Sequence, residues 1–144
     1  MGHANKSIGT LLENLDYGSL VLPEIQRDFV WKKQHVLFLF DSLYRSLPIG
    51  SMLVWKAKTI VPTKKKGAIR GHAIANFYGY LLDGQQRLTA IQRVRDRDDH
   101  YPLLFMLRPN HALQGDNDRF QYATGKNNSD PWLVPVADVL AKNF

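Results

Sequence analysis

At residues 81–88 the chain reads Leu81-Leu82-Asp83-Gly84-Gln85-Gln86-Arg87-Leu88, and the predicted fold is built outward from this stretch. The apolar residues that end at Leu82 predict a strand. Asp83-Gly84 predicts a sharp turn, because glycine permits backbone angles that other residues avoid. Apolar side chains then recur at helical spacing as far as Val94, which predicts a helix that begins near Gln85. The sequence therefore predicts a strand, a tight turn and a helix in direct succession.

The start of this helix is a candidate anion-binding site. The backbone N–H groups of the first helical turn point out of the helix end, and Arg87 adds a cation one turn in. Asp83 places a carboxylate beside them, which could hold a Mg²⁺ bound to phosphates or orient a water. Gln85 and Gln86 could hydrogen-bond a base, a ribose or a water. The same residues also have a purely structural interpretation, in which Asp83 caps the helix and Arg87 forms its salt bridge.

Two further segments carry polar residues that could line a cleft. In the irregular segment 23–31, a proline and two aromatic residues could hold Gln26 and Arg27 at the mouth of a cleft. After a predicted helix, Gly50 would let the backbone approach a ligand, and the Ser51 hydroxyl could meet a phosphate. Both segments also have a plain explanation, the first as an ordered loop pinned by its aromatic side chains and the second as a helix stop.

The pattern of apolar residues predicts helices and strands in alternation. Helices are expected over 8–15 (capped by Ser7 and ended by Gly18), over 33–47, from 85 into the charged run 93–99, and over 136–141. Strands are expected over 20–22, 51–56, 78–82, 101–107 and, at a sheet edge, 120–123. This alternation indicates an α/β or an α+β domain.

The composition excludes several classes of protein. With 144 residues, 44% of them hydrophobic and 22% charged, the chain has the length and usage of one ordinary globular domain. The sequence contains no cysteine, which excludes disulfides, thiolate catalysis and cysteine-ligated zinc or iron–sulfur centres. No apolar run reaches the roughly 18 residues of a membrane helix, and residues 1–10 lack a signal peptide, which indicates a soluble cytoplasmic protein without a membrane partner. Because the chain stops at Phe144 directly after its last predicted helix, we expect an N-terminal fragment of a longer protein.

The positive charge of the chain is concentrated in one segment. The formal net charge is +6, and acids balance bases everywhere except in residues 56–72, which hold six basic residues and no acid. Clustered Lys and Arg suit the phosphate backbone of DNA, although three consecutive lysines are also common in solvated surface loops. The candidate DNA-binding residues are Lys56, Lys58, Lys64, Lys65, Lys66 and Arg70.

Together these motifs resemble the N-terminal domain of GmrSD-type, modification-dependent restriction proteins, a domain shared by the phosphorothioation-sensing defence protein SspE. The resemblance covers most of residues 7–140, and the Asp-Gly-Gln-Gln-Arg block at 83–87 is highly specific. The matching blocks are 7–15, Leu22-Pro23-Glu24-Ile25-Gln26-Arg27-Asp28-Phe29-Val30-Trp31, Leu47-Pro48-Ile49-Gly50-Ser51-Met52-Leu53-Val54-Trp55, 81–91 and 132–140.

The resemblance implies a fold and a nucleotide site. The implied fold is an α+β domain of the ParB/sulfiredoxin-like type, a small mixed sheet packed by helices, with residues 1–144 as a single domain. The implied activity is binding and hydrolysis of a nucleoside triphosphate, GTP, UTP or CTP-like, with Mg²⁺ at Asp83. The residues with implied catalytic roles are Asp83, Gln85, Gln86 and Arg87. The residues implied to bind the nucleotide are Gly84, with Gln26 and Arg27 lining the same cleft, and Gly50 and Ser51 at its edge.

In this family the domain is coupled to recognition or cleavage of modified DNA, and cleavage usually belongs to a C-terminal His-Asn-His nuclease domain. We therefore expect DNA and such a nuclease domain as partners in a prokaryotic antiphage restriction system, and no nuclease active site within this chain. A homo-oligomer is an open alternative. Sulfiredoxin chemistry needs a cysteine and is excluded. Two other hypotheses stay open, a non-enzymatic DNA-binding module that recognises modified DNA through the basic segment, and a toxin-like or structural domain whose motif loops only brace the fold.

Overall fold

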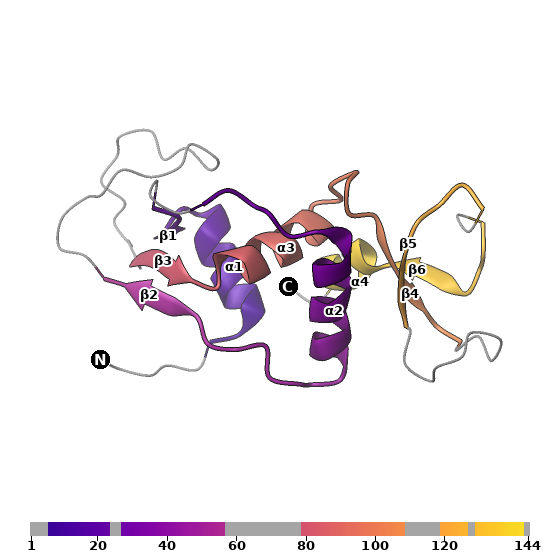
Figure 1. Ribbon diagram of the computed structural model, residues 1–144, viewed down its shortest axis with the longest axis horizontal. Helices are drawn as coiled ribbons and strands as arrows, with labels where there is room; N and C mark the ends of the chain where they lie inside the picture. The colour runs from indigo at the N-terminus through magenta and orange to yellow at the C-terminus, as the bar shows by residue number, and fades with distance from the viewer. Residues whose placement is uncertain (1–5, 24–26, 57–78, 109–118, 127–128, 143–144) are drawn as a thin grey trace. The chain divides into compact units, whose positions relative to one another are not determined.

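The structure is a computed structural model that describes residues 6–23, 27–56, 79–108, 119–126 and 129–142. These residues form four helices and two three-stranded sheets, which confirms the α+β class (Figure 1). None of the described helices is long and apolar enough to cross a membrane. The chain divides into two compact units, Met1–Val30 with Gly50–Leu88, and Trp31–Ile49 with Thr89–Phe144. The ParB/sulfiredoxin-like relationship and the single-domain organisation stay predictions.

The first unit is built from one complete helix and a small mixed sheet, the kind of sheet that the family resemblance implies. Its elements are α1 (Ile8–Asp16), β1 (Leu20–Val21), β2 (Leu53–Trp55) and β3 (Gly79–Asp83). β3 is the central strand, with β1 parallel to it on one side and β2 antiparallel on the other. Ser7 caps α1 as predicted, since its Oγ accepts the N–H of Thr10 at 3.1 Å. Leu12, Leu20 and Leu81 are at most 1% exposed and form the core of this unit.

The predicted central helix is α3 (Gln85–Arg95). It begins in the first unit and continues into the second, because the division between the units falls directly after Leu88. Leu88, Ile91 and Val94 are at most 2% exposed, which confirms the buried face that their spacing predicts.

The second unit contains a sheet that is additional to the one expected from the sequence. Its elements are α2 (Lys33–Tyr44), β4 (Leu103–Met106), β5 (Phe120–Tyr122), β6 (Leu133–Pro135) and α4 (Val136–Lys142). β4 is central and pairs antiparallel with β5 and β6, so in the sheet that the described residues form, the strand predicted at 120–123 lies at an edge, as expected. α2 packs on β5, where the rings of Phe40, Tyr44, Phe105 and Phe120 have centroids 5.2 to 6.1 Å apart.

Three helices end beside a residue in the left-handed conformation. These residues are Gly18 (φ +70°), Ser46 (φ +56°) and Arg97 (φ +59°). After α2, the N–H groups of Ser46 and Leu47 turn back to carbonyls of the last helical turn at 3.1 and 2.8 Å, which is the Schellman arrangement. α2 therefore ends at Tyr44, three residues before the predicted end at Leu47. The predicted end is too late because no glycine marks this stop in the sequence.

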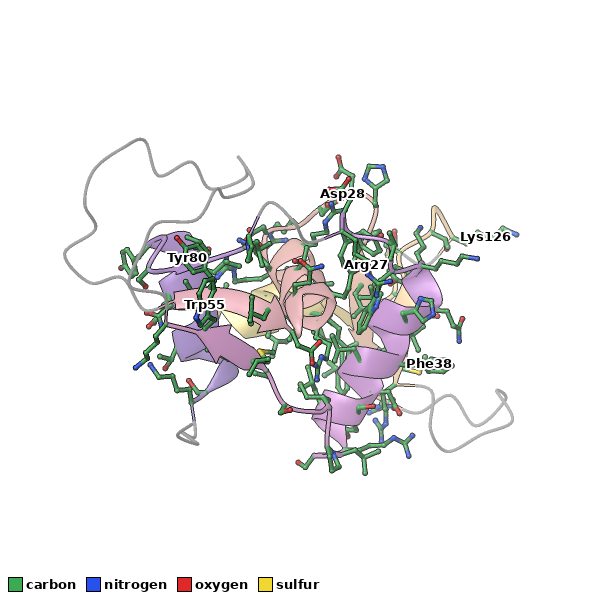
Figure 2. The ribbon with its side chains drawn as sticks, turned by 60° about the vertical axis from the view of Figure 1, so that its left-hand side comes forward. Arg27, Asp28, Phe38, Trp55, Tyr80 and Lys126 are labelled. Atoms are coloured by element: carbon green, nitrogen blue, oxygen red, sulfur yellow. The ribbon has the colours of Figure 1, made fainter. Side chains whose placement is uncertain are left out.

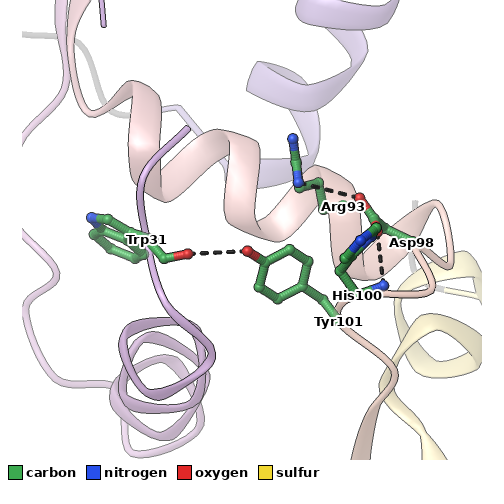
Figure 3. A network of polar contacts seen from close by, with 5 residues as sticks. All are labelled: Trp31, Arg93, Asp98, His100 and Tyr101. Atoms are coloured by element: carbon green, nitrogen blue, oxygen red, sulfur yellow. Dashed lines mark hydrogen bonds and ion pairs between the residues drawn. The ribbon is translucent and has the colours of Figure 1, made fainter. Parts of the chain in front are cut away.

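A polar network lies at the C-terminal end of α3 in the second unit (Figure 3). Asp98 accepts the backbone N–H of His100 at 2.9 Å and lies 3.4 Å from Nη1 of Arg93. The hydrogen bond from His100, helped by the charge of Arg93, holds the pKa of Asp98 below its usual value. The stability that this carboxylate contributes is therefore present at neutral pH and is lost as the pH falls through its lowered pKa. Beside it, the Tyr101 hydroxyl donates to the carbonyl of Trp31 at 3.0 Å.

Candidate functional site

The predicted turn lies between β3 and α3, within the first unit. Gly84 has a φ of +89°, and a Cβ at this position would lie 2.7 Å from Cγ of Met52, so the turn requires glycine for two separate reasons. The N–H of Leu88 donates to the Gly84 carbonyl at 3.0 Å, which makes Gly84 the N-cap of α3. The interpretation with Asp83 at the N-cap is therefore wrong by one residue. Asp83 ends β3, and its side chain is 70% exposed.

The two glutamines of the motif are buried and hold a neighbouring segment of the chain. Gln85 is 7% exposed and Gln86 is 8% exposed. The Gln86 amide bonds two backbone groups at once, since its Nε2 donates to the Asp28 carbonyl at 2.9 Å and its Oε1 accepts the Val30 N–H at 3.0 Å. Nε2 of Gln85 donates to the Arg27 carbonyl at 3.1 Å. The first turn of α3 thus fixes this segment through three hydrogen bonds.

Arg87 reaches the segment that leads into β2. Its Nη2 donates to the Ser51 carbonyl at 2.7 Å and lies 3.4 Å from Oδ2 of Asp83, so the salt bridge of the structural interpretation is present. Gly50 has a φ of +85°, and a Cβ there would lie 2.4 Å from Nη1 of Arg87. Gly50 therefore makes room for the Arg87 guanidinium, where the sequence suggested the close approach of a ligand. Ser51 takes part through its backbone carbonyl.

The turn combines a helix N-terminus, a fixed cation and an exposed carboxylate. The first N–H groups of α3 precede its first intrahelical bond and are directed out of the helix end. The Arg87 side chain is only 15% exposed, whereas the Asp83 carboxylate faces solvent. Such N–H groups and a guanidinium suit phosphate oxygens, and a carboxylate suits Mg²⁺. In the described part of the chain no group of three or more His, Asp or Glu side chains could hold a metal ion. A cation at Asp83 would therefore need phosphate or water ligands as well.

The structure gathers most of the predicted site residues around the first turn of α3. The residues gathered there are Arg27, Gly50, Ser51, Asp83, Gly84, Gln85, Gln86 and Arg87. Lys56 is exposed and directly follows β2. The predicted site residues that lie outside the described ranges are Gln26, Lys58, Lys64, Lys65, Lys66 and Arg70. The functional roles of all these residues stay predictions.

The hydrogen bonds by which Gln85 and Gln86 hold the Arg27–Val30 segment were not apparent from the sequence. Their partners lie as much as 58 residues earlier, and no local pattern marks a backbone carbonyl as a partner. One signal was available for Gln85, which lies three residues before Leu88 and therefore beside the face that helical spacing buries. A polar residue on such a face must find hydrogen-bond partners inside the protein.

The second unit contains an open cavity of about 460 Å³. Apolar side chains such as Val94, Leu104 and Leu133 line most of it, together with the charged residues Arg97 and Asp98. None of the described site residues of the first unit lines this cavity, so it is a feature separate from the predicted turn.

Comparison with known proteins agrees with the motif. Over residues 8–137 the sequence matches the family described as GmrSD restriction endonuclease, N-terminal domain. It is also 33% identical over 98 residues to an uncharacterized protein of Methanocaldococcus jannaschii, in a match that covers 63% of this chain and 17% of that relative. The chain therefore spans a small part of the length of this relative. The family match includes β3, the Gly84 turn and α3, and the chain accordingly belongs to the family of GmrSD restriction endonuclease N-terminal domains.

Proposed function

We propose that this chain is the nucleoside-triphosphate-binding and hydrolysing domain of a GmrSD-type antiphage restriction system that acts on modified DNA. One observation carries the nucleotide part of the proposal. The exposed Asp83 carboxylate directly precedes the N-terminal turn of α3, in which Arg87 is fixed by Ser51. Donors for phosphate and a ligand for Mg²⁺ thus occur in one turn of the chain. Membership of the family supports the restriction-system context.

Each residue of the turn would have a separate role. The first N–H groups of α3 would bind phosphate oxygens, and Arg87 would neutralise part of their charge. Asp83 would hold Mg²⁺, which supplies further neutralisation of the phosphates when bound. For Gln85 and Gln86 we propose a positioning role, because their buried amides hold the backbone of the Arg27–Val30 segment.

Asp83→Asn is expected to weaken triphosphate binding by roughly tenfold or more when Mg²⁺ is present, the effect of losing one charge-assisted contact. With Mg²⁺ removed by EDTA, the variant should bind at least as tightly as the wild type, because the Asp83 carboxylate then only repels the phosphates. Isothermal titration of the full-length protein with GTP, UTP and CTP, each with and without Mg²⁺, measures both effects.

Asp96→Asn is a matched control, since Asp96 directly follows α3, is 52% exposed and pairs with Arg95 at 2.7 Å. This control should bind triphosphate like the wild type. Unchanged affinity of Asp83→Asn in Mg²⁺ would remove Asp83 from the proposed site, and equal losses in both variants would indicate a general effect of surface charge.

A second candidate function is DNA binding by the basic segment 56–72. It is supported by the sequence, because this segment holds the whole net charge of the chain and no acid. Lys56, the residue of this segment that the structure describes, is exposed at the end of β2. We propose that the segment contacts phosphates without reading bases, and that a His-Asn-His nuclease domain performs cleavage in the whole restriction protein.

Replacement of Lys64, Lys65 and Lys66 by serine should flatten the salt dependence of DNA binding. Each phosphate contact contributes about −0.9 to the slope of log K against log salt, so six contacts would give about −5, and we expect roughly −2 to −3 in the wild type. The triple variant should lose up to about 3 units of this slope while its unfolding free energy stays within about 0.5 kcal/mol. A salt titration of duplex binding measures the slope.

A second triple variant serves as the control for this titration, with the exposed lysines Lys6, Lys32 and Lys126 replaced by serine. It removes the same charge from other parts of the chain and should leave the slope nearly unchanged. Identical slopes for the wild type and the Lys64–Lys66 variant would show that these lysines are only solvated.

A further inference from the structure

Trp55 and Tyr80 form an aromatic pair at the edge of the sheet in the first unit. They are register partners on β2 and β3, with ring centroids 5.8 Å apart and planes inclined by 39°. Figure 2 shows the two side chains next to each other on the sheet. Tyr80 is 2% exposed, whereas Trp55 is 46% exposed. A buried ring therefore supports an indole that keeps nearly half of its surface open to solvent.

The residues that flank Trp55 are apolar on one side and basic on the other. Leu53 lies two positions earlier on β2 and is 45% exposed. In the sheet formed by the described residues, β2 is an edge strand. Lys56 follows directly and is exposed, and the sequence from it to residue 72 carries six basic residues and no acid. The exposed Trp55 thus directly precedes, in the chain, the segment that carries the net charge.

We propose that Trp55 is a stacking platform for an unpaired base of single-stranded DNA, with Lys56 beside the adjoining phosphate. An indole face stacks on any base, and a neighbouring cation binds the backbone, which is the combination that single-stranded DNA requires. Paired bases are covered by their neighbours in a duplex, so the platform favours unpaired or extruded nucleotides. The proposal rests on the DNA contact proposed above and adds that this surface binds single-stranded DNA.

Binding of two labelled oligomers to the full-length protein separates stacking from phosphate contact. One is an oligothymidine, and the other is an abasic oligomer of the same length and charge, each followed by fluorescence anisotropy. Trp55→Ala should weaken oligothymidine binding about tenfold, the size expected for one stacked base, and change abasic binding by less than about twofold. Trp55→Phe keeps an aromatic face on Tyr80 and should restore most of the oligothymidine affinity.

Trp132→Ala is the matched control, because Trp132 is 42% exposed but one face of its ring is covered by the Arg108 guanidinium at 3.6 Å. It should leave both affinities unchanged, and circular dichroism should show all variants folded. Wild-type oligothymidine affinity in Trp55→Ala, or equal losses on both oligomers, would overturn the stacking proposal and leave the DNA contact standing. If the wild type binds neither oligomer nor duplex, the DNA contact and the platform both fail.

Discussion

Gly50→Ala is expected to destabilise the first unit by about 2 to 3 kcal/mol. Alanine at a φ of +85° carries strain of roughly 1–2 kcal/mol. Its methyl group would also lie 2.4 Å from Nη1 of Arg87. The flexible guanidinium would move away and lose its bond to the Ser51 carbonyl, a charge-assisted contact that adds about 1 kcal/mol at this partly exposed position. Thermal unfolding should show a fall in Tm of roughly 8 °C.

A double-mutant cycle with Arg87→Ala separates the backbone strain of Gly50→Ala from the clash between its methyl group and the Arg87 guanidinium. In that background no guanidinium stands against the new methyl group, so Gly50→Ala should cost only the strain of roughly 1–2 kcal/mol. Gly125→Ala is the control, since a Cβ at Gly125 would meet no atom within 4 Å. It should change the unfolding free energy by less than about 0.5 kcal/mol. Wild-type stability in Gly50→Ala would show that Gly50 is a helix stop of no special conformation.

Gln86→Leu is expected to destabilise the first unit by about 2 to 3 kcal/mol. Leucine is close to glutamine in size but leaves the Asp28 carbonyl and the Val30 N–H without their partner, at a cost of about 1–3 kcal/mol for each group that stays buried. Both backbone groups are partly buried, so each is expected to cost roughly 1–1.5 kcal/mol, near the lower limit of this range. Hydrogen exchange at the Val30 amide should accelerate more than exchange at the amides of α3, because the segment loses its attachment to the helix.

Two further variants test this prediction, one at Gln86 itself and one at an exposed control position. Gln86→Glu keeps an acceptor for Val30, but its ionised carboxylate cannot donate to the Asp28 carbonyl and is costly to bury, so its loss of stability at neutral pH should be at least as large as that of Gln86→Leu. Gln34→Leu changes an exposed glutamine at the second position of α2, the position that Gln86 has in α3, and should stay within about 0.5 kcal/mol of the wild type. A Gln86→Leu variant with unchanged Val30 exchange would mean that the glutamine does not hold this segment in solution.

Several features were predictable from the sequence because they depend on residues close together in the chain. Ser7 at the start of α1, Gly84 at the turn and the buried Leu88, Ile91 and Val94 face of α3 each follow from local conformational preference or from helical spacing. The family resemblance depended in the same way on short blocks of consecutive residues, and the family match confirms it. The end of α2 was missed because Ser46 carries no local signal for the left-handed conformation.

The sequence by itself determined the order of the elements except β6, the strand, turn and helix at Asp83–Arg87, and the basic segment that carries the net charge. Only the tertiary structure decided what the motif's side chains contact. Gln85 bonds a backbone group 58 residues earlier, and Gln86 bonds groups 58 and 56 residues earlier. Arg87 bonds a carbonyl 36 residues earlier. The sheet and α3 bring these partners together, although they are far apart in the chain. Because a buried amide or guanidinium needs a hydrogen-bond partner wherever the fold supplies one, no local pattern could identify those contacts.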